Sequence, residues 1–271
     1  MQAKKHLWQN FLKNTKILDM IVWEVSLQNK NIIEVWPWHG DLTAALLKKT
    51  PKTLTLIEID DDMLPILEQR FSHESVAVYH NDVLGMDIQY RTDTKTFPAW
   101  FFSKEKVIYT SEYIVYGNIP YYITSPIIHH FLYDVSLRPQ VAVFTMQKEV
   151  AERILARDGK QSVLSLCCQL VADVIKICDI SPNNFTPIPK VWSTCLKFIL
   201  RDDVYRDSSQ LVSFIKKGFS QKRKQLMSHL TQFGYKREKL REIFQKIHIS
   251  ENIRPEDLIL SQWQQLFERL R

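Results

Sequence analysis

The stretch Ile32-Ile33-Glu34-Val35-Trp36-Pro37-Trp38-His39-Gly40-Asp41-Leu42-Thr43 decides the fold of this chain. It begins with apolar, mostly β-branched residues, which predict a buried strand, and it continues after the proline as an apolar helical pattern. Strand, tight turn and helix form the first unit of a nucleotide-binding α/β domain, whose ligand lies at the turn. Such a turn normally needs glycines, which adopt positive φ and let the backbone approach a ligand. Gly40 is present, but Trp36 and Trp38 stand where the other glycines are expected.

Strands and helices alternate along the chain up to about residue 202. Further strands are predicted at residues 53–60, 76–79, 113–116, 140–145 and 193–200, with helices at 15–27, 62–71 and 125–133. Residues 86–106 have no clear period, so we expect an irregular connection there. From residue 208 on, the pattern is helical and polar, without a strand signal. We therefore expect an α/β domain over residues 1–202, followed by a small all-α domain over residues 203–271.

The composition is that of a cytoplasmic globular protein with an anionic partner. Hydrophobic residues make up 45% and charged residues 24% of the 271 residues. There is no apolar run of about 18 residues, so we expect no membrane span. The N-terminus has no signal-peptide core. The four cysteines form no CxxC pair, so we expect reduced thiols and no metal site. The net charge of +6 weakly favours nucleic acid as partner, and basic residues cluster at 148–160 and 216–224.

Polar side chains follow the predicted strands at the points where the strands end. Glu34 precedes the turn, Glu58 ends the second strand, and Asp82 follows the third. Ligands of an open α/β sheet bind beyond the carboxyl ends of its strands. Glu58 lies about 20 residues after the turn, where an acid can hydrogen-bond ribose hydroxyls. Because no Walker lysine follows the turn, the spacing favours an adenosine-containing cofactor, either a dinucleotide or S-adenosylmethionine.

The segment Asn118-Ile119-Pro120-Tyr121 favours S-adenosylmethionine over a dinucleotide. The Asn118 side-chain oxygen and the Ile119 carbonyl can accept both hydrogens of an exocyclic amine, while Tyr121 stacks on the base. Accepting both hydrogens localises the nitrogen lone pair, which can then attack a sulfonium methyl in line. This chemistry is positioning and electrostatic stabilisation without a covalent intermediate. The alternative interpretation is an ordinary turn at a strand end.

Taken together, these motifs resemble the KsgA-type small-subunit ribosomal RNA adenine N6,N6-dimethyltransferases from end to end. Leu7-Trp8-Gln9-Asn10-Phe11-Leu12 is similar to the family's Gly-Gln-Asn-Phe-Leu entry motif, and Glu34–Thr43 is similar to its Glu-Ile-Gly-Pro-Gly-x-Gly-x-Leu-Thr loop. Further matches are Ile57–Asp60, Gly117–Tyr121, Gln147–Val150, Phe185–Val191, Gln221–Lys224 and Arg254–Leu258.

The resemblance implies a Rossmann-like, S-adenosylmethionine-dependent methyltransferase domain and a C-terminal helical domain that contacts rRNA. The cofactor-binding residues that it implies are Asn10, Leu12, Glu34, Trp36, Glu58, Asp82 and Asn118, and the catalytic ones are Asn118, Pro120 and Tyr121. Family substrates are two adjacent adenosines in a hairpin near the 3′ end of 16S rRNA, in an immature ribosomal particle. Each adenosine must leave its stack to reach the pocket, and the basic clusters would contact phosphates. We expect a monomer.

The chain departs from the family pattern at Trp8, Trp36 and Trp38, which all stand at glycine positions. It has only six glycines, where average usage would give about 19, and it has seven tryptophans. One interpretation is a degenerate paralogue without cofactor binding. We favour recoding, in which the cell of origin reads the UGA codon as glycine. The chain as written is then expected to bind S-adenosylmethionine poorly.

Three other functions are compatible with parts of this pattern. The related 23S rRNA adenine methyltransferases of the macrolide-resistance type share the cofactor loop, but Gln147–Val150 and Arg254–Leu258 favour the small-subunit enzymes. A non-catalytic RNA-binding assembly factor would have its pocket blocked by Trp36 and Trp38. A nicotinamide-dependent oxidoreductase is disfavoured by the segment from Asn118 to Tyr121 and by the absence of a second nucleotide-binding half.

Overall fold

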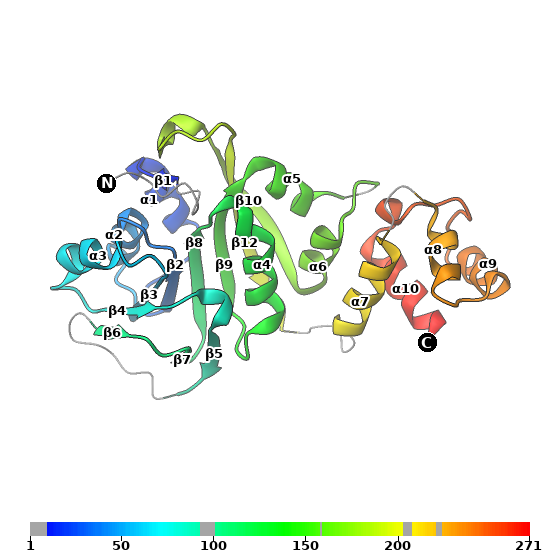
Figure 1. Cartoon of the computed structure of the whole chain (residues 1–271), viewed down its shortest axis with the longest axis horizontal. Coiled ribbons are helices and arrows are strands. Elements are labelled where there is room, and N and C mark those ends of the chain that lie inside the picture. The colour runs from blue at the N-terminus through cyan, green and yellow to red at the C-terminus, as the bar shows by residue number, and fades with distance from the viewer. Residues whose placement is uncertain (1–9, 93–100, 158, 203–207, 221–223) are drawn as a thin grey trace. The chain divides into compact units, whose positions relative to one another are not determined.

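The computed structural model describes residues 10–92, 101–157, 159–202, 208–220 and 224–271 (Figure 1). The chain forms two compact units. The α/β unit comprises Met1–Ala151 and Ile175–Leu200, and the helical unit comprises Glu152–Val174 and Arg201–Arg271. The sequence division at residue 202 assigned residues 152–174 to the first domain, whereas they belong to the helical unit in the structure. No helix in the described ranges is long and apolar enough to cross a membrane.

Eight strands of the described residues form the mixed sheet of the α/β unit, in the order β10-β12-β9-β8-β2-β3-β4-β6 (Figure 1). They are β2 (Asn31–Val35), β3 (Thr53–Glu58), β4 (Val76–His80), β6 (Phe101–Ser103), β8 (Tyr113–Asn118), β9 (Val141–Gln147), β10 (Ala172–Ile180) and β12 (Ser193–Leu200). The strands from β9 to β6 run parallel, and β12 pairs antiparallel with β9. The chain leaves β2 toward β3 and returns later to β8 on its other side. The carboxyl ends of β2 and β8 therefore form a topological switch point, where ligands of such sheets bind.

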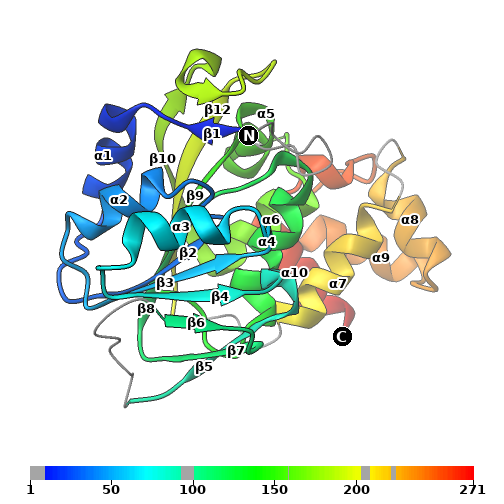
Figure 2. The same cartoon turned by 60° about the vertical axis from the view of Figure 1, so that its left-hand side comes forward.

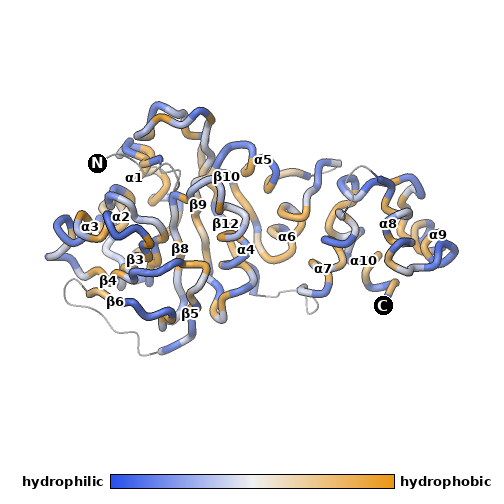
Figure 3. The backbone as a smooth tube through the Cα atoms, viewed as in Figure 1, coloured by the Kyte–Doolittle hydropathy of each residue, from blue (hydrophilic) through white to orange (hydrophobic). Residues whose placement is uncertain are grey.

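Helices cover both faces of this sheet, which explains why β2 is buried at every position (Figure 2). The helices of one face are α1 (Thr15–Trp23), α2 (Asp41–Leu47) and α3 (Leu64–Phe71). Leu46 and Phe71 from these helices share a core with Ile32 of β2. On the other face, α4 (Thr124–His129) leads into a π-helical turn, in which the Phe131 ring lies 5.9 Å from the Phe144 ring of β9. Figure 3 shows the apolar residues along the central strands.

Two strands occur where the sequence predicted an irregular connection at residues 86–106. Strand β5 (Asp87–Tyr90) pairs in parallel with β7 (Val107–Thr110), and β6 adds to the edge of the main sheet beside β4. The prediction was wrong because each of these strands is short and has a single buried position, which gives no alternating pattern. Their pairing partners lie far along the chain, so tertiary context decides their conformation.

The helical unit contains α6 (Val163–Val171), α7 (Ser208–Gly218), α8 (Leu226–Gln232), α9 (Arg237–Lys246) and α10 (Leu260–Leu270). Trp263 of α10 is fully buried and stacks on Phe219 at a centroid distance of 5.7 Å. A Cβ atom on Gly218 of α7 would overlap the Trp263 ring. This fit between a glycine and an indole indicates that tryptophan is the residue for which the core is shaped.

Candidate active site

The turn after β2 has a backbone that suits glycine at three alternate positions. The φ angles are +54° at Trp36, +55° at Trp38 and +82° at Gly40. Residues with a Cβ rarely adopt this left-handed region, which costs about 1–2 kcal/mol for an ordinary side chain. At Gly40 a Cβ would in addition overlap the Phe71 ring. The turn therefore has the geometry of a glycine-rich loop, although two of its three left-handed positions carry tryptophan.

Both indoles fill the space beside this turn, and each is only 5% exposed. Trp36 and Trp38 line a cavity together with Leu12, Glu34 and Asn118, at the carboxyl ends of β2 and β8. Trp38 also lines a second cavity, which includes Pro120 and Tyr121. Its Nε1 donates a hydrogen bond of 3.2 Å to the main-chain oxygen of Asn118. The Trp38 indole thus lies at the junction of the two cavities. Trp8, the third tryptophan at a glycine position, lies outside the described residues.

The buried carboxylate of Glu34 has an unused acceptor. Its Oε2 accepts a hydrogen bond of 2.7 Å from the Thr43 hydroxyl, whereas its Oε1 is buried without a hydrogen-bond partner in the described part of the chain. Burial raises the pKa of Glu34 to about 8, against the smaller opposing effect of the bond from Thr43. An unsatisfied carboxyl oxygen in a cavity wall is suited to a hydrogen-bond-donating ligand, and a cationic ligand would favour its ionised form.

Glu58 lies at the end of β3, and its carboxylate accepts hydrogen bonds from the protein backbone. Oε1 accepts from the main-chain nitrogens of Ile59 and Asp60 at 2.9 Å and 2.8 Å, and Oε2 accepts from Trp38 at 3.3 Å. The residue is fully buried, and this burial raises its pKa to about 7. Glu58 is thus bonded to the main chain of the turn at Trp38, and it lines neither of the two cavities.

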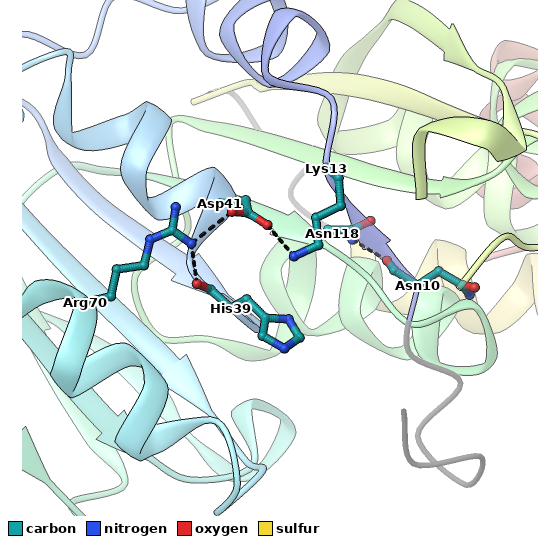
Figure 4. A network of polar contacts seen from close by, with 6 residues as sticks. All are labelled: Asn10, Lys13, His39, Asp41, Arg70 and Asn118. Atoms are coloured by element: carbon teal, nitrogen blue, oxygen red, sulfur yellow. Dashed lines mark hydrogen bonds and ion pairs between the residues drawn. The ribbon is translucent and has the colours of Figure 1, made fainter. Parts of the chain in front are cut away.

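Asn10 and Asn118 are far apart in the sequence but adjacent in the structure (Figure 4). The Asn118 side-chain nitrogen donates a hydrogen bond of 2.8 Å to the main-chain oxygen of Asn10. This orientation presents Oδ1 of Asn118 as an acceptor on the other side of the amide. The entry segment is held in place because β1 (Phe11–Leu12) pairs antiparallel with β11 (Phe185–Thr186). Asn118 lines both cavities, and Asn10 lines the second.

Pro120 and Tyr121 form the wall of the second cavity. Pro120 precedes a 3-10 turn, and its main-chain oxygen accepts a hydrogen bond of 3.1 Å from the nitrogen of Ile123. The Tyr121 hydroxyl lies 2.8 Å from the hydroxyl of Ser193 at the start of β12. Burial raises the pKa of Tyr121 above its ordinary value, and either of the two hydroxyls can donate this bond. The tyrosine ring is therefore held by a contact between two distant segments.

Asp82 is a predicted site residue that lies outside the lining of the two cavities. It is exposed after β4, and its Oδ1 accepts a hydrogen bond of 3.1 Å from the nitrogen of Leu84. Asp82 lines neither of the two cavities. The structure thus brings Asn10, Leu12, Glu34, Trp36, Asn118, Pro120 and Tyr121 together around the two cavities, connects Glu58 to them through Trp38, and leaves Asp82 outside.

A charged network beside the turn was not predicted from the sequence (Figure 4). Asp41 at the start of α2 forms ion pairs with Lys13 at 3.0 Å and with Arg70 of α3 at 2.9 Å. Arg70 also donates a hydrogen bond of 2.6 Å to the main-chain oxygen of His39. Burial raises the pKa of Asp41, but the bonds from Arg70 and Lys13 outweigh this effect and lower it. The acid at the helix start was a visible signal, whereas its partners depend on the tertiary structure.

Comparisons of the sequence identify relatives along the whole chain. Residues 1–271 match the model of the family described as ribosomal RNA adenine dimethylase. A protein of Mycoplasmopsis pulmonis named ribosomal RNA small subunit methyltransferase A is 36% identical over 276 residues, which cover 100% of both chains. A protein of the same name from Prochlorococcus marinus is 32% identical, over 98% of this chain and 94% of its own.

Solved structures with the same fold include two RNA-modifying enzymes. The 23S rRNA methyltransferase ErmE has a TM-score of 0.72 at 22% identity, covering 96% of this chain and 99% of its own. A dimethyladenosine transferase from Plasmodium falciparum has a TM-score of 0.74 at 24% identity, covering 94% and 95%. At these identities the likeness shows the fold alone. The predicted Rossmann-like methyltransferase fold with C-terminal helices is confirmed.

Proposed function

The chain belongs to the ribosomal RNA adenine dimethylase family, and from this premise we propose that its protein dimethylates N6 of two adjacent adenosines near the 3′ end of 16S rRNA. The relatives matched over 94–100% of their lengths support the small subunit as target, because their names specify that subunit. The fold does not discriminate, since a 23S rRNA methyltransferase has it too. We propose an immature ribosomal particle as substrate, a monomer as the acting species and rRNA contact by the helical unit.

The observation that carries this proposal is the position of Asn118, which lines both cavities. Its Nδ2 is engaged by Asn10 at 2.8 Å, so its Oδ1 is available for one hydrogen of a target amine. The Ile119 carbonyl would accept the other, and the Tyr121 ring, fixed through Ser193, would stack on the base. These two hydrogen bonds from the amine would increase the electron density at the adenine nitrogen and orient its lone pair.

The implied cofactor is S-adenosylmethionine, which supplies the methyl group in this family. The acids and amides of the site fit such a ligand, since Glu34 has an unused buried oxygen and Asn10 and Asn118 lie at the cavity wall. The side chains of the turn do not fit it. Two buried indoles occupy the place where the backbone would approach the cofactor, and both carboxylate oxygens of Glu58 already accept hydrogen bonds from main-chain donors.

We therefore propose that the catalytically competent protein carries glycine at positions 36 and 38. Among the tryptophans of the described residues, these two have positive φ, whereas Trp23, Trp192 and Trp263 do not. Trp263 fits its core, so among the described tryptophans the deviation is confined to the turn. Decoding of UGA as glycine in the cell of origin explains this pattern without loss of Glu34, Asn10 or Asn118. The codons at both positions, or the mass of the corresponding peptide from the native source, test this proposal directly.

The activity is tested with small and large ribosomal subunits from a strain that lacks the dimethylation. The variant Trp36→Gly/Trp38→Gly should transfer labelled methyl groups from S-adenosylmethionine to small subunits, with primer-extension stops at two adjacent adenosines. Transfer to large subunits alone would instead support the 23S type. Absence of transfer to either subunit by the glycine variant would contradict the proposal.

For the chain as written, a second candidate function is a non-catalytic ribosome assembly factor. The blocking position of Trp38 between the two cavities favours it. This candidate predicts that the chain as written and the glycine variant bind the small subunit equally well, and that neither transfers methyl groups. Methyl transfer by the glycine variant would rule it out for the protein made in the cell of origin.

A further inference from the structure

The loop before β12 exposes several large apolar side chains next to the proposed target pocket. Ile188 is 65% exposed, Val191 is 43% exposed and Trp192 is 50% exposed. Three such side chains within five residues form a surface that is unfavourable in water unless a partner covers it. Pro189 within the loop is buried, so the segment is packed against the protein rather than detached from it.

The backbone of Trp192 is anchored although its indole is exposed. Its main-chain oxygen accepts a hydrogen bond of 2.9 Å from the nitrogen of Lys148, at the start of α5 (Lys148–Leu155). The next residue, Ser193, pairs in register with Gln147 of β9. The exposed ring is thus presented from the end of the main sheet. A ring carried on a fixed backbone loses less conformational freedom when it binds a flat partner than a ring on a mobile loop.

A contact with Tyr121 connects this surface to the proposed pocket. The hydroxyl of Ser193, one residue after Trp192, lies 2.8 Å from the Tyr121 hydroxyl. Tyr122, which follows in the same turn, is 54% exposed. A partner that occupies the pocket at Tyr121 would therefore extend naturally onto the loop that carries Trp192.

The charges around Trp192 favour a polyanion as this partner. The Lys148 ammonium lies 5.7 Å from the centroid of the Trp192 ring, and Lys190 is exposed two residues earlier. Lys148 and Lys176 both pair with Asp179, so this group keeps a net positive charge. Aromatic faces combined with cations are the recognition elements of single-stranded nucleic acid, whose bases stack while its phosphates pair with lysine. An apolar protein partner would not require these cations.

We propose that Trp192 stacks on the base of the nucleotide adjacent to the target adenosine in single-stranded RNA. The inference rests on the proposed function, in which the target base leaves its stack and enters the pocket. Its departure removes a stacking partner from the neighbouring base, and the Trp192 indole replaces that partner. With two adjacent adenosines as substrate, the residue holds one adenosine while the other is in the pocket. Trp192 is then a positioning residue for RNA and does not contact the cofactor.

The test uses the full chain carrying Trp36→Gly/Trp38→Gly, here the parent chain, and an RNA hairpin with two adjacent loop adenosines, one of which is replaced by fluorescent 2-aminopurine. Stacking quenches this probe, so its intensity reports the environment of the neighbouring base. Trp192→Ala should weaken RNA binding by about tenfold, within the range known for a stacked base, and should leave the probe bright. Trp192→Phe should retain most of the affinity and the quenching, because it keeps an aromatic face.

Trp23→Ala is the matched control, since Trp23 is also exposed, at 73%, and also has a lysine over its ring. It should change neither affinity nor fluorescence. Equal binding and equal quenching for Trp192→Ala and the parent chain would overturn the inference while leaving the proposed function intact. If the parent chain bound neither the hairpin nor the small subunit, both the inference and the proposed function would be contradicted. This outcome is recognised from the parent chain alone, without the Trp192 variants.

Discussion

The ammonium of Lys13 lies 3.0 Å from Oδ2 of Asp41, and this ion pair connects the entry segment to the first residue of α2. The entry segment passes over the turn, where the ring of Phe11 meets the ring of Trp38 at a centroid distance of 5.6 Å. Arg70 pairs with the other carboxylate oxygen of Asp41 and fixes its orientation. The position of the entry segment over the turn therefore depends on a contact between segments that are distant in the sequence and meet only on folding.

Asp41→Asn is expected to loosen the contact between the entry segment and the turn while leaving the fold intact. Because both partners are partly exposed, the loss in unfolding free energy should be small, about 0.5–1 kcal/mol. The backbone amides of residues 10–14 should exchange faster with solvent, measured by hydrogen–deuterium exchange. Lys16→Ala, an exposed lysine of the same region, is the control. Unchanged exchange at residues 10–14 in Asp41→Asn would contradict the prediction.

Trp36→Gly/Trp38→Gly is expected to raise the affinity for S-adenosylmethionine by at least about tenfold. The change removes two buried indoles and relieves the left-handed strain, about 1–2 kcal/mol for each residue. It also frees the space between Asn118 and the turn. Titration calorimetry on both proteins measures the effect, and a version with glycine also at position 8 extends it. Trp23→Gly is the control, and equal affinity of the parent and the double variant would refute the prediction.

The sequence revealed the turn because its requirements are local. A β-branched strand, a proline and a helix pattern predict the unit, and the need for positive φ identifies Trp36 and Trp38 as anomalous without coordinates. Asn10 was assigned to the site only through the family resemblance, and its hydrogen bond with Asn118 was not predicted. The ion pairs of Asp41 and the backbone bonds to Glu58 could not be predicted, since they depend on distances between separate elements. The strands near residue 100 were missed for the same reason.

The contribution of Glu34 and Glu58 to the free energy of unfolding is expected to fall as the pH rises from about 4.5 to about 8. Burial raises the pKa of Glu34 from 4.5 to about 8 and that of Glu58 from 4.5 to about 7. The folded protein then binds more protons than the unfolded chain in this window, so rising pH favours unfolding. Glu34→Gln should flatten the dependence, measured as urea midpoints across the window. Glu68→Gln, at an exposed position, should leave it unchanged, and parallel curves for all three proteins would contradict the assignment.

Asn118→Ala in the glycine background is expected to lower the rate constant of methyl transfer by about 10²–10³-fold, the effect of removing one preorganised polar group. The affinity for RNA should change little, because the side chain acts on the amine rather than on phosphates. Single-turnover kinetics on small subunits separate the two quantities. Loss of RNA binding with an unchanged transfer rate would instead assign Asn118 a role in docking. Circular dichroism checks that loss of the bond to Asn10 leaves the fold intact.

Gly218→Ala is expected to lower the free energy of unfolding by about 1–3 kcal/mol, the usual effect of overpacking a core. The added methyl group would overlap the Trp263 ring, which is fully buried and cannot move into solvent. Thermal or urea unfolding measures the loss. Gly85→Ala is the matched control, since its Cβ would meet no atom within 4 Å and its backbone needs no positive φ.

A double-mutant cycle with Trp263→Phe shows whether the ring is the cause. Phenylalanine is smaller and leaves room for the new methyl group, so Gly218→Ala should cost less in the Trp263→Phe background than in the parent chain. The two changes would be additive if the loss did not involve the Trp263 ring; helix propensity alone predicts a gain, because alanine is a better helix former than glycine. Additivity would therefore remove the argument that this core is shaped for tryptophan, and with it the contrast between Trp263 and the two tryptophans of the turn.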